Sequence, residues 1–401
     1  MASFIGAKPE TRATALKKHV VSAFAPGHVL TYEGVVNDTM EILIQQLENH
    51  GPVVEIVEWL RYFMLDTLSR IAFSEDLGFM ANREDIDGTL AGAQQRFDHW
   101  HYWLAVPYLE QLIFKNPIVL RFTKPSSRLA ALALRKIDAR KQQGKEAGEF
   151  YDLLSQYLQA GQKDPEVIDS MAVIGLTIST IHAGADTTAA ATSMFFEHIL
   201  RHPAKLAKLE DELATAPLSQ PPTFTELNKL PYLDACIKES MRLQTIIGDM
   251  LERVVGSSGA EIAGSWVPGG TVVTVSSHVV NRDENIWGSN TEIYNPDRWT
   301  EADEVQRRRM ERSLIAFGAG KRICLGQHIA WLEMKKLIPR LLTTYKVGIL
   351  NRPGQSRRLE IKNLQLADLR SFVTDFPRLC QDAVPHGYGF YAERAPRRAT
   401  A

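Results

Sequence analysis

The segment at residues 317–326 places a single cysteine between a glycine-rich loop and a predicted amphipathic helix at 325–343. It reads Phe-Gly-Ala-Gly-Lys-Arg-Ile-Cys-Leu-Gly. The free N–H groups and positive dipole end of that helix, together with Lys321 and Arg322, favour the thiolate form of Cys324. The glycines let the backbone approach a large flat ligand closely. These properties are required of a cysteine that serves as axial ligand to heme iron.

Two simpler interpretations of this segment compete with heme ligation. A lone cysteine is usually a small buried apolar residue. A phosphate-binding loop needs Ser or Thr after its lysine, but Arg322 follows here, so the spacing excludes a nucleotide site. The whole string resembles the heme-ligand signature of the cytochrome P450 family, Phe-x-x-Gly-x-Arg-x-Cys-x-Gly. The resemblance implies heme b, with Cys324 on its iron and with further cofactor contacts from Phe317, Gly318, Arg322 and Gly326.

A second stretch, Ala-Gly-Ala-Asp-Thr-Thr at 183–188, lies inside a long predicted helix at 165–200. Glycine inside a helix costs about 1 kcal/mol relative to alanine, and an acid beside two threonines makes a poor core. One interpretation is a helix crossing that needs small residues. The family has a similar sequence where its longest helix passes over the heme. By that resemblance Gly184 opens room for dioxygen, Thr187 hydrogen-bonds it and Asp186 relays protons to it.

Glu239 and Arg242 lie three residues apart on a predicted helix at 231–244, so they share a face and can form a charge-assisted bond. Taken alone, this pair is equally typical of a solvated helix surface. The stretch Asn-Pro-Asp-Arg-Trp at 295–299 resembles the family's Pro-Glu-Arg-Phe segment, with Asp for Glu and Trp for Phe. The resemblance implies that Arg298 joins Glu239 and Arg242 in a buried triad that braces the cysteine loop.

Two further cations are candidates for the heme propionates. Residues 11–24 resemble the family's third major helix, in which a Trp-x-x-x-Arg pair is usual; Ala13 and Lys17 occupy those two positions here. The other interpretation of Lys17 is a solvated helix face. Arg253 begins a predicted strand where the family often keeps an arginine, and a guanidinium can bind a carboxylate in bidentate fashion. The alternative for Arg253 is a surface ion pair with Glu252 or another neighbour.

Composition limits the classes of protein to which the chain can belong. Its 401 residues, 45% of them hydrophobic, suffice for one large globular unit, and the net charge of −1 gives no sign of nucleic-acid binding. Three cysteines are too few for a disulfide framework and fit a reducing compartment. No uninterrupted run of about 18 apolar residues occurs, so no membrane-spanning helix is predicted.

Hydrophobic periodicity predicts a mainly α fold with a small β region (α+β), and the resemblance makes it the cytochrome P450 fold. Helices are expected at 9–24, 31–49, 59–72, 126–145, 151–160, 165–200, 203–215, 231–244 and 325–343. Strands are expected at 251–255, 261–262, 265–267, 271–276, 345–350 and 387–392. The aromatic-rich run at 97–108 is interpreted as core, although the family places a mobile substrate lid nearby.

The resemblance covers nearly the whole chain and implies a single P450 catalytic domain at 1–401. We expect the membrane anchor, the proline-rich hinge and the first strands of microsomal members to be missing before Met1. Those members lie on the cytosolic face of the endoplasmic reticulum membrane; this chain alone suggests a soluble or peripheral protein. Residues 253–326 resemble the fungal branch that includes pisatin demethylase and many secondary-metabolite oxidases.

The implied activity is a monooxygenase that inserts one oxygen atom of dioxygen into an apolar small molecule, with electrons from NADPH-cytochrome P450 reductase. The reductase is expected to dock on the cysteine side, near Lys321, Arg322 and the arginines at 307–309, although a charge run is by default a solvated face. One alternative is a heme-thiolate isomerase or dehydratase, which would use neither reductase nor dioxygen. The other is a truncated, inactive remnant of such an enzyme.

Overall fold

The computed structural model describes residues 10–50, 53–104, 106–114, 116, 118, 128–142, 152–247, 251–350, 358–362 and 391–394. They form two compact units, each described by itself. The first unit comprises Met1–Asn49, Trp59–Thr188 and His328–Ala330. The second comprises His50–Glu58, Ala189–Gln327 and Trp331–Ala401.

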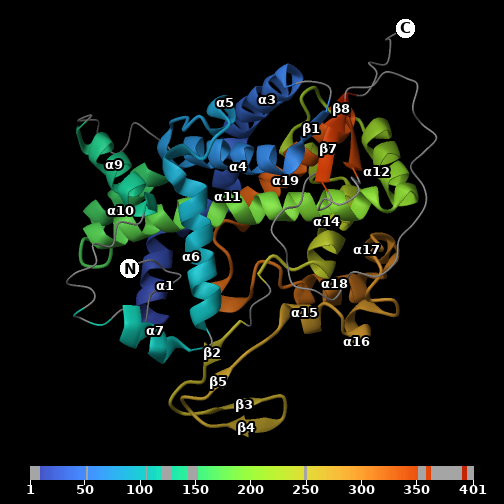
Figure 1. The fold of residues 1–401 in the computed structure, drawn as a ribbon. Coiled ribbons are helices and arrows are strands. Elements are labelled where there is room, and N and C mark those ends of the chain that lie inside the picture. The colour runs from blue at the N-terminus through green and yellow to red at the C-terminus, as the bar shows by residue number, and fades with distance from the viewer. Residues whose placement is uncertain are drawn as a thin grey trace. The chain divides into compact units, whose positions relative to one another are not determined.

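The first unit is helical (Figure 1). Its helices are α1 (Glu10–Val20), α2 (Pro26–Val29), α3 (Glu33–Asn49), α4 (Ile56–Phe73), α5 (Phe79–Asn82), α6 (Thr89–Leu104), α7 (Pro107–Phe114), α9 (Arg128–Gln142), α10 (Leu153–Lys163) and most of α11 (Ser170–Leu200). Short 3-10 turns occur at Val21–Phe24, Leu30–Tyr32 and Ile86–Gly88. Helix α3 illustrates why these segments are helical: its apolar residues follow one another at helical spacing and are buried, as for Val36, Met40, Leu43 and Leu47.

The second unit contains the remaining helices and the strands. Its helices are α12 (Pro203–Thr215), α13 (Phe224–Leu227), α14 (Pro231–Leu243), α15 (Ser277–Val280), α16 (Glu284–Trp287), α17 (Asp297–Glu301), α18 (Glu304–Ser313) and α19 (Gln327–Thr344), with a 3-10 turn at Gly320–Arg322. Proline at the first position starts α12 and α14, where its missing N–H costs nothing. One core cluster is formed by four buried side chains from α14, α16, α17 and α18, which are Ala235, Trp287, Trp299 and Met310.

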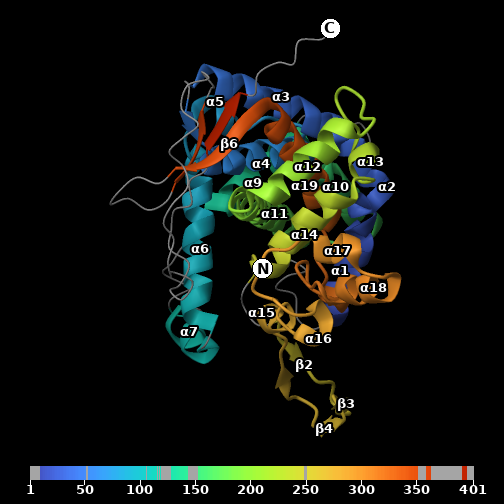
Figure 2. The same ribbon diagram turned by 90° about the vertical axis from the view of Figure 1, so that its right-hand side faces the viewer.

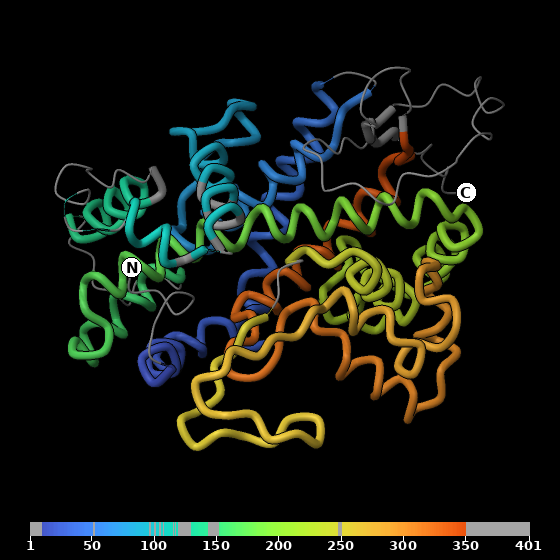
Figure 3. Tube along the Cα trace, turned by 60° about the horizontal axis from the view of Figure 1, so that its bottom comes forward, coloured from blue at the N-terminus to red at the C-terminus, as the bar shows by residue number. Residues whose placement is uncertain are grey.

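Three small antiparallel sheets belong to the second unit. Strands β1 (Val53–Glu55), β6 (Tyr345–Leu350), β7 (Arg358–Lys362) and β8 (Tyr391–Arg394) close on one another in the order β1-β7-β6-β8. Strand β2 (Arg253–Val254) pairs with β5 (Val272–Val273), and β3 (Ala260–Ile262) pairs with β4 (Ser265–Val267). A two-residue turn joins β3 to β4, with φ of +50° at Ala263 and +77° at Gly264. Figures 2 and 3 show that this hairpin forms the tip of the segment whose two sides are β2 and β5.

The structure confirms the predicted mainly α architecture, with differences at element ends. Helix α11 begins at Ser170 rather than 165 because Asp169 caps it, accepting a 2.7 Å bond from the Ala172 N–H. Helix α19 begins at Gln327, two residues later than expected. Strands β2 and β5 are shorter than predicted, and of the expected strand at 387–392 only 391 and 392 fall in the described part, within β8.

The prediction of a core at 97–108 is wrong for two of its aromatic residues. Tyr102 on α6 is 75% exposed and Tyr108 on α7 is 85% exposed. Aromatic composition alone does not show which face of a helix each ring occupies, which explains the error. Across the described helices, none combines the length and apolar character needed to cross a bilayer.

Candidate functional site

The cysteine loop is shaped by two glycines and closed by backbone hydrogen bonds. Gly318 and Gly320 have φ values of +73° and +66°, a left-handed conformation that other residues adopt only with strain. The Cys324 N–H donates to the Phe317 carbonyl over 2.9 Å, and the Gly318 N–H donates to the Ile315 carbonyl over 2.8 Å. The backbone therefore fixes where Cys324 emerges from the loop.

Cys324 is exposed, whereas Cys236 on α14 is fully buried. Burial raises the pKa of the Cys236 thiol far above its ordinary value, so that sulfur stays protonated and inaccessible. A Cβ added at Gly326 would lie 4.0 Å from the Cys324 Sγ, in ordinary van der Waals contact, so Gly326 is the residue beside the sulfur. An accessible thiol beside a residue without a side chain fits a flat iron-bearing ligand.

One side chain of this loop packs on the helix that follows it. The Phe317 ring lies 6.3 Å from the Trp331 ring of α19, between centroids and at 44°. Arg322 lies half-buried in the 3-10 turn and Lys321 is exposed. The phenyl ring thus ties the start of the loop to the helix that follows it.

Glu239, Arg242 and Arg298 meet in the second unit. Arg242 donates from Nη2 to Glu239 Oε1 over 2.8 Å and from Nε to Oε2 over 2.9 Å. Arg298 donates from Nε to Glu239 Oε1 over 2.9 Å. The side chains of Glu239 and Arg242 have no exposed area, and that of Arg298 is 8% exposed. The solvated-surface interpretation of this pair is therefore wrong.

The triad has further partners that the sequence did not reveal. The Trp299 indole N–H donates to Glu239 Oε2 over 2.9 Å, and the Asn295 backbone N–H donates to Oε1 over 3.0 Å. Arg242 also donates to the carbonyls of Asn281 and Thr291, each over 2.7 Å. Where the family has phenylalanine, this chain has tryptophan, and only tryptophan carries an N–H; that substitution was the available signal.

Asp297, the residue that replaces the family's glutamate, faces α12 instead. Its carboxylate bonds to Lys205 and, over 2.6 Å, to Lys208. These two lysines, with the hydrogen bonds that they donate, lower the pKa of Asp297 against the opposing effect of burial. The stretch 295–299 is therefore fixed to α14 through one set of side chains and to α12 through another.

Asp186 and Thr187 lie on α11 in the first unit. Thr187 Oγ1 donates to the Ala183 carbonyl over 2.7 Å, within its own helix. Asp186 Oδ1 accepts from Arg61 Nε over 2.9 Å, and Arg61 comes from α4, 125 positions earlier. No sequence signal indicated that arginine.

Gly184 has a packing role, as one interpretation of the sequence held. A Cβ added at Gly184 would lie 2.8 Å from Leu68 Cδ2 of α4, closer than real Cβ contacts. The missing side chain therefore accommodates Leu68 of α4, and the role of Gly184 in making room for dioxygen stays a prediction.

The two candidate propionate ligands lie in different units. Lys17 is half-buried on α1 in the first unit, next to the turn at which its helix changes to 3-10 geometry. Arg253 is exposed on β2 in the second unit and donates from Nη1 to the Glu252 backbone carbonyl over 2.7 Å. That bond is to the main chain, so the expected alternative, an ion pair with the Glu252 carboxylate, is not what the structure shows.

In the described part of the chain, the predicted site residues fall into three groups. The cysteine loop and the triad both belong to the second unit, with Arg253. Asp186 and Thr187 form the third group, in the first unit, which also contains Lys17.

Comparison with known proteins gives one consistent result. The model of the family described as Cytochrome P450 matches residues 5–366. A cytochrome P450 monooxygenase of Aspergillus terreus is 37% identical over 360 residues, covering 86% of this chain and 73% of that protein. The monooxygenase pkfB of Emericella nidulans is 32% identical over 348 residues (84% and 68%), and mfmA of Annulohypoxylon moriforme is 30% identical over 354 (84% and 68%).

The family so identified consists of heme-thiolate proteins in which a cysteine binds the iron, and the relatives are oxygen-incorporating oxidoreductases by name. A family match over most of the chain, with relatives that it covers by more than two thirds, leaves one conclusion: this chain belongs to the cytochrome P450 family of monooxygenases.

Proposed function

We propose that this P450 inserts one oxygen atom of dioxygen into a C–H bond of an apolar small molecule, as a step in fungal secondary metabolism. The observation that carries the proposal is the exposed thiol of Cys324 at the end of a loop bent by two left-handed glycines. The fungal relatives that are named monooxygenases support the reaction class. The place in secondary metabolism rests on the resemblance of residues 253–326 to that branch.

Cys324 is proposed as the ligand to the heme iron, and Gly318 and Gly326 as the residues that leave room beside the ring. Arg322, Arg253 and Lys17 are proposed to bind the propionates through their positive charges. When bound, the heme supplies dioxygen activation, for which the thiolate donates electron density. The protein supplies the orientation, the protons and the exclusion of water.

Asp186 and Thr187 are proposed to manage the protons. Because the Thr187 hydroxyl proton is engaged by the Ala183 carbonyl, its oxygen is left as an acceptor that can hold a proton-bearing group in place. Asp186 is 21% exposed, so its carboxyl can exchange protons with water. In the balanced reaction, substrate, dioxygen, NADPH and one proton give hydroxylated product, water and NADP⁺.

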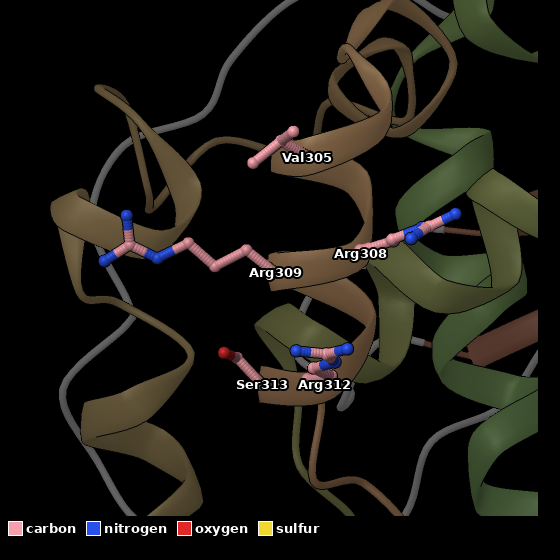
Figure 4. A pocket seen from close by; sticks show the side chains of 5 residues that line it. All are labelled: Val305, Arg308, Arg309, Arg312 and Ser313. Atoms are coloured by element: carbon pink, nitrogen blue, oxygen red, sulfur yellow. The ribbon is translucent and has the colours of Figure 1, made fainter.

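The electron donor is proposed to be NADPH-cytochrome P450 reductase, bound through positive charge on the second unit. A surface hollow of about 480 Å³ on α18 is lined by Val305, Arg308, Arg309, Arg312 and Ser313 (Figure 4). Arg308 pairs with Glu304, whereas Arg309 and Arg312 have no ion-pair partner in the described part of the chain. Two uncompensated arginines suit an acidic partner surface. By resemblance, that encounter takes place on the cytosolic face of the endoplasmic reticulum.

The test is the difference spectrum of the reduced protein with carbon monoxide. Cys324→Ser should abolish the red-shifted band, because only a thiolate ligand produces it. Cys236→Ala is the matched control: it removes the other described, buried thiol and should keep the band. A Cys324→Ser protein that keeps the red-shifted band would remove this cysteine from the proposed role. Turnover without reductase and dioxygen would instead indicate an isomerase or dehydratase.

A further inference from the structure

We infer that Arg61 is a positioning residue for proton delivery, acting through Asp186. Arg61 lies on α4, outside every motif that identified the family. The inference rests on the proposed role of Asp186 and adds to it a residue that holds the acid in place.

The contact is well placed for this role. Arg61 Nε donates to Asp186 Oδ1 over 2.9 Å, a charge-assisted bond. The Arg61 side chain is 35% exposed and that of Asp186 is 21% exposed, so the pair lies at the edge of the first unit's interior. Within the described residues, nothing donates to the other carboxylate oxygen, Oδ2. One oxygen is therefore held and the other is open to water.

The two helices are also fixed against each other beside this pair. Leu68 lies two turns along α4 from Arg61, on the same face, and it fills the space that a side chain at Gly184 would need. Gly184 is two residues from Asp186 on α11. Because packing sets the distance between the helices, the Arg61 guanidinium meets Asp186 at a defined position rather than sampling the surface.

An acid used in proton transfer must be held within hydrogen-bond reach of its acceptor, and a displacement of about 1 Å can cost about 100-fold in rate. Without Arg61, the Asp186 carboxylate loses the bond that fixes its rotamer. Proton delivery is then misdirected. Dioxygen that has gained two electrons from NADPH and two protons leaves as hydrogen peroxide, instead of going on to water, or to water and product when a substrate is bound. The expected signature is a rise of roughly tenfold in peroxide released, with the heme site intact.

The experiment compares Arg61→Gln, Arg61→Lys, Asp186→Asn and Arg61→Gln/Asp186→Asn in heme-loaded enzyme with reductase and NADPH. Hydrogen peroxide formed per dioxygen consumed can be measured without knowing the substrate. Arg70→Gln is the matched control, since Arg70 is on the same helix and in a 2.7 Å ion pair with Asp76, away from α11. Each variant is first checked for the red-shifted carbon monoxide band.

The inference requires that Arg61→Gln raises the peroxide fraction, that Arg61→Lys raises it less, and that the double variant equals Asp186→Asn. A normal fraction in Arg61→Gln with a raised one in Asp186→Asn overturns the inference and leaves the proposed function intact. A normal fraction in Asp186→Asn overturns both roles. A double variant worse than Asp186→Asn shows that Arg61 acts by another route, which also overturns the inference.

A second measurement does not depend on turnover. In urea unfolding of the natural protein, Arg61→Gln, Asp186→Asn and the double variant, the double-mutant cycle should show that Arg61 and Asp186 are coupled, by about two- to fivefold in the unfolding equilibrium constant. This readout also serves if Arg61→Gln holds heme poorly. The absence of coupling would mean that the two side chains do not meet in solution, and the inference would fall.

Discussion

Replacing Arg242 by alanine should strongly destabilise the second unit, although Arg242 contributes nothing to the exposed surface. Arg242 is completely buried, with two bonds to Glu239 and two 2.7 Å bonds to the backbone carbonyls of Asn281 and Thr291. Removing one partner of a buried ion pair costs about 3–5 kcal/mol. Because Glu239 keeps its bond to Arg298, we expect a loss near 3 kcal/mol, at the lower end of that range.

Replacing Glu239 by alanine should destabilise the protein more than replacing Arg242 does, and the order of the two losses is the sharper test. Glu239→Ala leaves two buried cations, Arg242 and Arg298, without their carboxylate, and it also removes the acceptor of the Trp299 indole N–H. We therefore expect a loss of about 4–5 kcal/mol. A domain at the low end of the ordinary range of stability, about 5 kcal/mol, would then be close to unfolding and should fail to retain heme.

The assay is the free energy of unfolding in urea, together with heme content after purification. Arg201→Ala is the control, because Arg201 forms an i,i+4 pair with Glu197 on α11 and is 31% exposed; it should lose less than about 1 kcal/mol. If Arg242→Ala unfolds within 1 kcal/mol of the natural protein and keeps its heme, the triad is not the brace described above. If Glu239→Ala loses less free energy of unfolding than Arg242→Ala, then unpaired buried charge does not determine the size of these losses.

Three further outcomes follow from the same contacts. Trp299→Phe keeps the ring but removes the N–H to the buried carboxylate, so urea unfolding should show a loss of about 1.5–3 kcal/mol; no loss would mean that the bond is dispensable. Gly184→Val should lose about 2 kcal/mol by overpacking against Leu68, and Leu68→Ala in the same chain should recover part of that loss, whereas simple additivity would contradict the packing. Burial lowers the pKa of His198 on α11 to about 4 in the folded state. The stability that neutral His198 contributes to the fold is therefore fully present above its unfolded-state pKa of 6.5, and it is lost as the pH falls from 6.5 toward 4. His198→Phe should therefore show a shallower acid loss of stability than the natural protein, by roughly 3 kcal/mol at full extent, and identical pH profiles would refute this.

The parts of the site that follow from local sequence could be predicted, and those that depend on distant packing could not. The cysteine loop is specified by its own glycines, and the structure gives Gly318 and Gly320 the left-handed φ values that only glycine adopts easily. Helix α12 was predicted to the residue because Pro203 starts it. The strands were predicted too long because their pairing partners, rather than their β-branched residues, set where β2 and β5 end.

Partners far apart in the chain escaped prediction. Arg61 reaches Asp186 across 125 positions, and nothing in the sequence of α4 shows that this half-buried cation has a partner on α11. The other residues of α4 from Trp59 to Ser69 are all buried. Trp299 was recognised as a departure from the family pattern, but the sequence does not show toward which acceptor its N–H points. For Tyr102 and Tyr108 the error was different. The aromatic composition of the segment predicted burial, but both side chains lie on exposed faces of their helices.

The contrast between the two described cysteines has a consequence for the chain before it acquires its cofactor. An accessible thiol can be oxidised stepwise to sulfenic and then irreversibly to sulfinic and sulfonic acids, whereas a buried, protonated one is inert. Cys324 is thus the vulnerable atom of the newly made polypeptide, and Cys236 is not. With Cys324 as the proposed heme ligand, heme insertion would protect this sulfur chemically. Chains that bind heme early would keep the thiol, and chains whose Cys324 is oxidised first would permanently lose the capacity to bind heme.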